Sequence, residues 1–157
     1  MRAPFYMINE SPFMAERIAS AMQHLGNLPP SFSNSVSEIG QYIAANLAKD
    51  QTLFTLGLDT LTPLTAVFCH TMLYRNGDQR PSLPVITLNN VATLNHSTDS
   101  QQYIQPLHAL GEAGDMVLIA CEQTESETLH RFIQAANDRG ITSIIIGMGQ
   151  LNQQIAQ

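Results

Sequence analysis

Positive charge is scarce in this sequence. Only 7 of its 157 residues are lysine or arginine, against 13 aspartates and glutamates, so the formal net charge is −6. Because the basic residues are scattered, the chain has no broad basic surface, which argues against direct binding to nucleic acid or to an anionic membrane. Phosphorylated substrates find no special electrostatic attraction either.

Cysteines and long apolar runs are equally sparse. The two cysteines, Cys69 and Cys121, belong to no CxxC pair and to no ligand cluster, so we interpret them as reduced, mostly buried thiols. No apolar run approaches the roughly 20 residues that a membrane-spanning helix needs. The first residues lack the apolar region of a signal peptide, because Asn9 and Glu10 interrupt it. We therefore expect a cytoplasmic protein that does not bind membranes.

Motifs for metals and cofactors are missing as well. The five histidines show no metal-ligand spacing, and Gly57 belongs to no GxGxxG dinucleotide motif. Ser126 has no histidine and aspartate partner apparent in the sequence, so we interpret it as a helix-capping residue rather than a nucleophile. The sequence predicts no metal ion and no cofactor.

Short apolar runs that alternate with helical patterns are what the chain does have. A run at 53–56 leads through Gly57 to a helix with Thr62 as its N-cap and Pro63 in its first turn, and then to a second run at 85–88. A strand–helix–strand unit of this length implies a right-handed parallel crossover, whose first turn is a common ligand site.

The second half of the chain continues this alternation. Strands are expected at 115–120 and 141–146, on either side of a helix that starts at a Thr124-x-x-Glu127 capping box. The short helix expected before them contains Pro106, which should kink it unless the proline lies in the first turn.

Two helical patterns precede the first strand, at 12–25 and 33–48, and predict a helical hairpin. The fold class is therefore α/β: a three-layer α/β/α sandwich with a parallel, doubly wound, flavodoxin-like sheet behind an N-terminal hairpin. We expect a single domain over 1–157, with the hairpin at 11–48, the α/β core at 52–147 and a glutamine-rich tail at 148–157.

Two stretches, RPSLP at 80–84 with the strand that follows it and ALGEAGDMVLIA at 109–120, resemble the sugar isomerase (SIS) domain family. Within that family they look most like the DnaA initiator-associating proteins (DiaA) and the phosphoheptose isomerases. The resemblance implies an SIS fold and an oligomer. It also implies a phosphosugar site formed by the turns after the first and third strands.

Both family motifs have changed in this chain. The first turn, Gly-Asn-Gly-Gly/Thr-Ser in the family, is Gly-Leu-Asp-Thr-Leu at 57–61, and the second, Ser-Thr-Ser/Arg-Gly-Asn-Ser, is Cys-Glu-Gln-Thr-Glu-Ser at 121–126. The resemblance places the metal-binding His and Glu of phosphoheptose isomerase at Val67 and Thr71, neither a plausible ligand. The family's catalytic Gln and His lie on a C-terminal helix without a counterpart here. We therefore predict no catalytic residue.

Carboxylates stand where the resemblance would place a phosphate. Glu122, Glu125 and Glu127 lie in or just before the first turn of the helix after the third strand, the end of a helix that favours anions. Asp59 adds a negative charge on the facing turn, and neither motif has a lysine or arginine nearby. We expect these charges to repel a phosphosugar.

The two turns and the end of the second strand still predict a ligand-binding cleft. Asn89 and Asn90 face the same crevice and could bind a neutral polar ligand, although asparagine after a strand is also common in turns. The candidate cleft residues are Gly57, Asp59, Thr60, Asn89, Asn90, Glu122, Thr124 and Ser126.

Three functions stay open at this point. The leading hypothesis is an SIS-fold protein that has lost catalysis and acts as a homo-oligomeric (dimeric or tetrameric) regulatory or adaptor module for a protein partner, as DiaA does. The second is a binding protein for a neutral or cationic carbohydrate derivative. The third is a sedoheptulose 7-phosphate isomerase, or another phosphosugar-binding enzyme, that uses residues not recognised here.

Overall fold

The computed structural model describes residues 30–74, 81–89 and 100–147, together with residues 16, 17, 19, 20, 22, 23 and 26. The chain forms two compact units, Met1–Ile39 and Gly40–Gln157, and the second unit contains the whole sheet. Within the described part, no helix is both long and apolar enough to cross a membrane.

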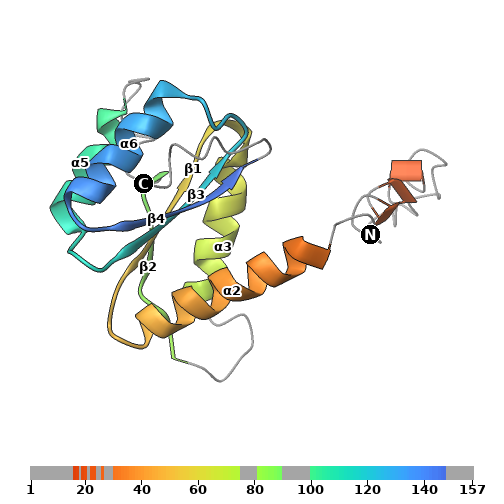
Figure 1. Cartoon of the computed structure of the whole chain (residues 1–157), viewed down its shortest axis with the longest axis horizontal. Helices are drawn as coiled ribbons and strands as arrows, with labels where there is room; N and C mark the ends of the chain where they lie inside the picture. Colours follow the sequence, from red (N-terminus) through yellow and green to blue (C-terminus); the bar gives the residue numbers. More distant parts are fainter. Residues whose placement is uncertain are drawn as a thin grey trace, which may run out of the picture. The chain divides into compact units, whose positions relative to one another are not determined.

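A parallel sheet of four strands forms the centre of the second unit (Figure 1). Its strands are β1 (Leu53–Gly57), β2 (Val85–Thr87), β3 (Met116–Cys121) and β4 (Thr142–Gly147), arranged in the order β2-β1-β3-β4. β1 pairs along its whole length with β3, from Leu53 opposite Met116 to Gly57 opposite Ala120. The predicted parallel sheet is confirmed, and its carboxyl ends converge on one edge.

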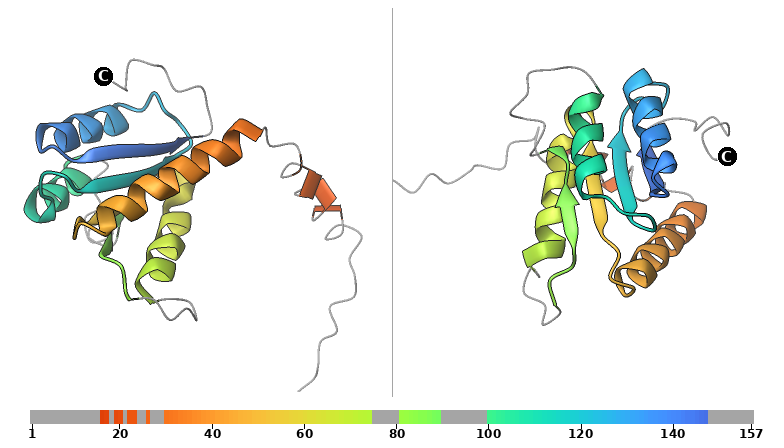
Figure 2. Two further views of the ribbon diagram at one scale, coloured as in Figure 1. Left: turned by 60° about the horizontal axis from the view of Figure 1, so that its bottom comes forward. Right: turned by 90° about the vertical axis from the view of Figure 1, so that its left-hand side faces the viewer.

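Helices cover both faces of this sheet. α3 (Thr62–Tyr74) joins β1 to β2, and α6 (Glu127–Asp138) joins β3 to β4, while α5 (Gln101–Leu110) precedes β3. α3 lies on one side of the strands, and α5 and α6 lie together on the other (Figures 1 and 2). The three-layer, doubly wound architecture expected from the alternation of patterns is therefore observed.

Side-chain alternation along β1 and β3 explains why the helices pack there. Every residue of both strands is buried, as expected for a central parallel strand covered on two faces. Phe54 and Val117 lie in the main hydrophobic cluster, while the intervening residues, such as Thr55, point to the other face. The cluster is completed from the helices by Ile104, Leu107, Leu129, Phe132, Ile133 and Ala136.

A buried carboxylate fastens the amino-terminal edge of the sheet. Asp115 is 4% exposed, and its two oxygens accept hydrogen bonds from the backbone N–H groups of Thr52 (2.8 Å) and Glu112 (2.8 Å). These bonds satisfy the buried charge and tie the start of β1 to the start of β3. The amino edge is thereby closed, and the opposite edge is left for the candidate site.

α2 (Pro30–Leu47) begins three residues before the predicted start at 33, with Pro30 at a first-turn position that proline suits. In the second unit, the Tyr42 hydroxyl donates to Thr142 Oγ1 (3.1 Å) and joins α2 to β4. The helix predicted at 12–25 lies mostly outside the described residues, although those described between 16 and 26 are helical. The hairpin and the single-domain boundaries stay predictions.

Candidate functional site

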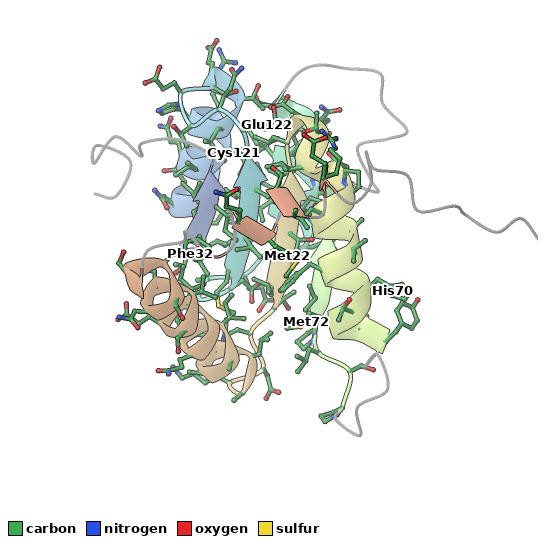
Figure 3. All side chains as sticks on the ribbon, turned by 90° about the vertical axis from the view of Figure 1, so that its right-hand side faces the viewer. Met22, Phe32, His70, Met72, Cys121 and Glu122 are labelled. Carbon is green, nitrogen blue, oxygen red and sulfur yellow. The ribbon has the colours of Figure 1, made fainter. Side chains whose placement is uncertain are left out.

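The candidate site lies at the carboxyl ends of β1, β2 and β3, where the turns after these strands meet. Cys121 and Glu122 stand at the end of β3, whereas His70 and Met72 lie further along α3 (Figure 3). Seven of the eight predicted cleft residues are described; Asn90 lies outside the described residues.

Asn89 is bonded to the end of β1 through both ends of its side-chain amide. Gly57 N–H donates to Asn89 Oδ1 (2.8 Å), and Asn89 Nδ2 donates to the Gly57 carbonyl (2.7 Å). Asn89 is 5% exposed, and the Thr65 hydroxyl also contacts its Oδ1 (3.4 Å). The side-chain amide of Asn89 thus pairs with the Gly57 backbone as a residue of a neighbouring strand would. It holds the turn after β1 against the end of β2.

Gly57 is required by the close approach of the following helix. A Cβ atom at this position would lie 2.5 Å from Thr62 Cα, 2.6 Å from Thr65 Oγ1 and 2.7 Å from the Leu61 carbonyl oxygen. The Thr62 hydroxyl in turn donates to the Gly57 carbonyl (2.9 Å). The start of α3 therefore packs directly on the strand end. The prediction of Thr62 as the N-cap was wrong, because Thr62 has helical backbone angles (φ −51°, ψ −45°) and its hydroxyl donates to a carbonyl instead of accepting an N–H of the helix.

The turn after β1 is a short 3₁₀ helix, η1 (Asp59–Leu61), which the sequence patterns did not predict. Leu58, which replaces the family's asparagine, is buried, and its N–H donates to the Ala120 carbonyl (2.8 Å). Asp59 adopts a left-handed conformation with φ of 54°, which is unusual outside glycine. The apolar Leu58 anchors the turn to β3, and the polar Asp59 and Thr60 that follow it are exposed.

A hydrogen bond joins the turns after β1 and β3: the Thr60 hydroxyl donates to Glu122 Oε1. The structure therefore brings Thr60 and Glu122 together, as the sequence suggested for two residues of one cleft. Within the described residues, no group of three or more His, Cys, Asp or Glu side chains could hold a metal ion.

The turn after β3 differs from the predicted capping box. Ser126, not Thr124, is the N-cap of α6, and its side chain makes no capping hydrogen bond. Glu127 instead pairs with Arg131 one turn along the helix (2.6 Å). Thr124 is buried (6% exposed) against Gly147, where a Cβ would lie 2.7 Å from Thr124 Cγ2. The capping-box prediction was wrong because Thr124 packs inward on the end of β4.

Asp59 acts electrostatically on two crevice residues that sequence reasoning did not select. Burial raises the pKa of the Cys121 thiol, and the Asp59 carboxylate raises it further. The same two causes, in the same order, raise the pKa of Tyr103 on α5. Both groups stay neutral near pH 7, and the Cys121 thiol is fully buried in the hydrophobic cluster. No sequence motif marked either residue.

The positions matching the family's metal ligands have other contacts. Val67 is 65% exposed, and the Thr71 hydroxyl donates to the Val67 carbonyl within α3 (2.9 Å). A valine has no ligand atom, and this threonine hydroxyl bonds to its own helix. These two residues therefore offer no metal-binding pair.

Comparison with known proteins gives sequence relatives and structural neighbours, while no family model matches the chain. DiaA proteins from Escherichia coli and Shigella boydii are 25% identical over 118 residues, which cover 72% of this chain and 60% of the relative. The chain thus spans about 60% of the length of the curated relatives it matches.

Among solved structures, a phosphoheptose isomerase from Francisella tularensis matches with a TM-score of 0.71 and 21% identity, over 90% of this chain and 76% of that one. The enzyme GmhA from Neisseria gonorrhoeae has a TM-score of 0.65 and 19% identity over 91% and 79% of the two chains. A HobA–DnaA (domain I–II) complex from Helicobacter pylori has a TM-score of 0.56 and 14% identity over 93% and 79%. The chain is therefore similar in sequence to DiaA and has the fold of the phosphoheptose isomerases.

Proposed function

We propose that this chain is a non-catalytic SIS-fold protein that acts in the cytoplasm as a homo-oligomeric adaptor for a protein partner. The observation that carries this proposal is the hydrogen bond from Thr60 to Glu122. It joins the two turns through the protein's own side chains, at the place where the resemblance puts the phosphosugar of the family.

The charges around this bond oppose a phosphate. The turns 57–62 and 121–126 contain Asp59, Glu122 and Glu125 and no lysine or arginine, whereas Glu127 is paired with Arg131. A phosphate oxygen about 4 Å from one of these carboxylates would be repelled by about 1 kcal/mol in bulk water and about 4 kcal/mol at a protein surface. The N-terminus of α6 attracts an anion by only about 0.3–1 kcal/mol at an exposed site, so the repulsion wins.

Two polar side chains beside the end of β1 are already used. Both amide atoms of Asn89 bond to Gly57, and the Thr62 hydroxyl does the same. A sugar hydroxyl would have to break these hydrogen bonds. Each buried polar group that is left without a partner costs about 1–3 kcal/mol. The crevice is therefore built to hold the turns together rather than to take up a ligand.

The adaptor role is suggested by the names of the relatives. DiaA is a DnaA initiator-associating protein, and the HobA structure is a complex with domains I–II of DnaA. A fold whose crevice has lost its ligand contacts can still present its surface to a protein. We therefore propose a protein partner, with DnaA as the first candidate to test.

We expect the chain to show no turnover of sedoheptulose 7-phosphate and no melting-temperature shift with millimolar concentrations of it. A ligand at about ten times its Kd would stabilise the fold by about 1.4 kcal/mol, which shifts the Tm of a domain this size by about 3–6 °C. The matched control is the double variant D59N/E122Q, whose crevice lacks these two charges. A shift confined to this variant supports repulsion as the cause, whereas turnover by the natural sequence would overturn the non-catalytic assignment.

We also expect the chain to bind the N-terminal domains I–II of DnaA from its own organism in surface plasmon resonance. The D59N/E122Q variant should bind equally well, because an adaptor surface does not need the crevice charges. Absence of binding at micromolar concentrations would remove DnaA as the partner. Loss of binding in the variant alone would place the partner at the crevice.

An amine-bearing sugar is a second candidate ligand, favoured by the position of Asp59. Burial and, after it, the Asp59 carboxylate raise the pKa of Tyr103, and Asp59 itself is exposed, so a cation placed there would meet a negative charge. Glucosamine in the same melting assay tests this candidate. A Tm shift that disappears in D59N/E122Q would favour binding of a carbohydrate derivative over the adaptor role alone.

A further inference from the structure

No further inference is drawn: the strongest candidate, the cavity of about 530 Å³ between α3 and β2 that Cys69, His70 and Thr87 help to line, is flanked by residues 75–80 and 90–99, which lie outside the described part of the chain, and nothing in the structure shows what covers or occupies it.

Discussion

Gly57→Ala is expected to unfold most of the protein or to leave it barely stable. The added methyl would lie 2.5–2.7 Å from Thr62 Cα, Thr65 Oγ1 and the Leu61 carbonyl oxygen, and two of these are backbone atoms that cannot move aside cheaply. Overpacking of a well-packed site costs about 1–3 kcal/mol, and this contact lies at the severe end of that range. A loss of about 3 kcal/mol or more is a large part of an ordinary domain stability of about 5–15 kcal/mol.

Gly40→Ala is the matched control for this change. Gly40 lies within α2 and a Cβ there meets nothing within 4 Å, so alanine should stabilise the helix by about 0.5–1 kcal/mol. Urea unfolding followed by circular dichroism gives both values. If Gly57→Ala cost no more than about 1 kcal/mol, the close approach of α3 to the end of β1 would be wrong.

Asn89→Ala should be the second most damaging substitution, with a loss of about 2–3 kcal/mol in urea unfolding. It leaves the Gly57 N–H without its acceptor in a buried position, whereas the Gly57 carbonyl keeps the Thr62 hydroxyl as a donor. Thr65→Val is the comparison, because it keeps both bonds between Asn89 and Gly57 and removes only the contacts of the Thr65 hydroxyl to the Thr62 carbonyl (3.0 Å) and to Asn89 Oδ1 (3.4 Å). Equal losses for the two variants would contradict the central role of Asn89.

Asn89→Asp should lower the unfolding free energy by an amount that depends on pH. A protonated carboxyl can accept from the Gly57 N–H and donate to its carbonyl, as the amide does, whereas a carboxylate would face that carbonyl with no proton between them. Burial therefore raises the folded-state pKa of this aspartate above its unfolded value of about 3.9.

The sign of the effect follows from linkage. Below about pH 4, the unfolding free energy of N89D should be nearly that of the natural chain. It should fall as pH rises through the higher folded-state pKa of the introduced aspartate. The measurement is the difference in unfolding free energy between N89D and the natural chain at each pH. A difference that does not change with pH would mean that the carboxylate finds another donor.

Much of the fold could be predicted from the sequence because its signals are local. β1 and β3 are short apolar runs ended by a glycine or a polar turn, and α6 has an apolar stripe that includes Leu129, Phe132 and Ile133. These patterns arise because the buried positions of each strand and helix are apolar, so they can be read from the local sequence. They predicted all four strands and their parallel direction.

Elements set by contacts between distant residues were not predicted. η1 forms because Leu58 binds to Ala120 of β3, which no local pattern near residue 58 reveals. Pro106 lies inside α5, beyond the first turn, which is the part of a helix where a proline causes no kink. The sequence predicts Thr124 as the N-cap of α6, whereas the structure has Ser126 there. No local pattern reveals this, because Thr124 packs against Gly147 of β4.

The candidate site shows the same division. The residue types and the turn positions could be found from the sequence, since carboxyl ends of parallel strands share one edge. The bonding of Asn89 to Gly57 and of Thr60 to Glu122 joins residues 32 and 62 apart in the chain, so their pairing required the structure.

The strand order also has a consequence for synthesis on the ribosome. β1 sits between β2 and β3, but β3 is made long after β1, and the bond from Thr52 to Asp115 already spans 63 residues. Until α5, β3 and α6 have emerged, Phe54 and Leu56 lack most of the apolar cluster that covers them. The nascent chain therefore exposes the central strand for most of its translation, at about 5–20 residues per second, and chaperones that recognise extended apolar segments should engage it before residue 138 is made.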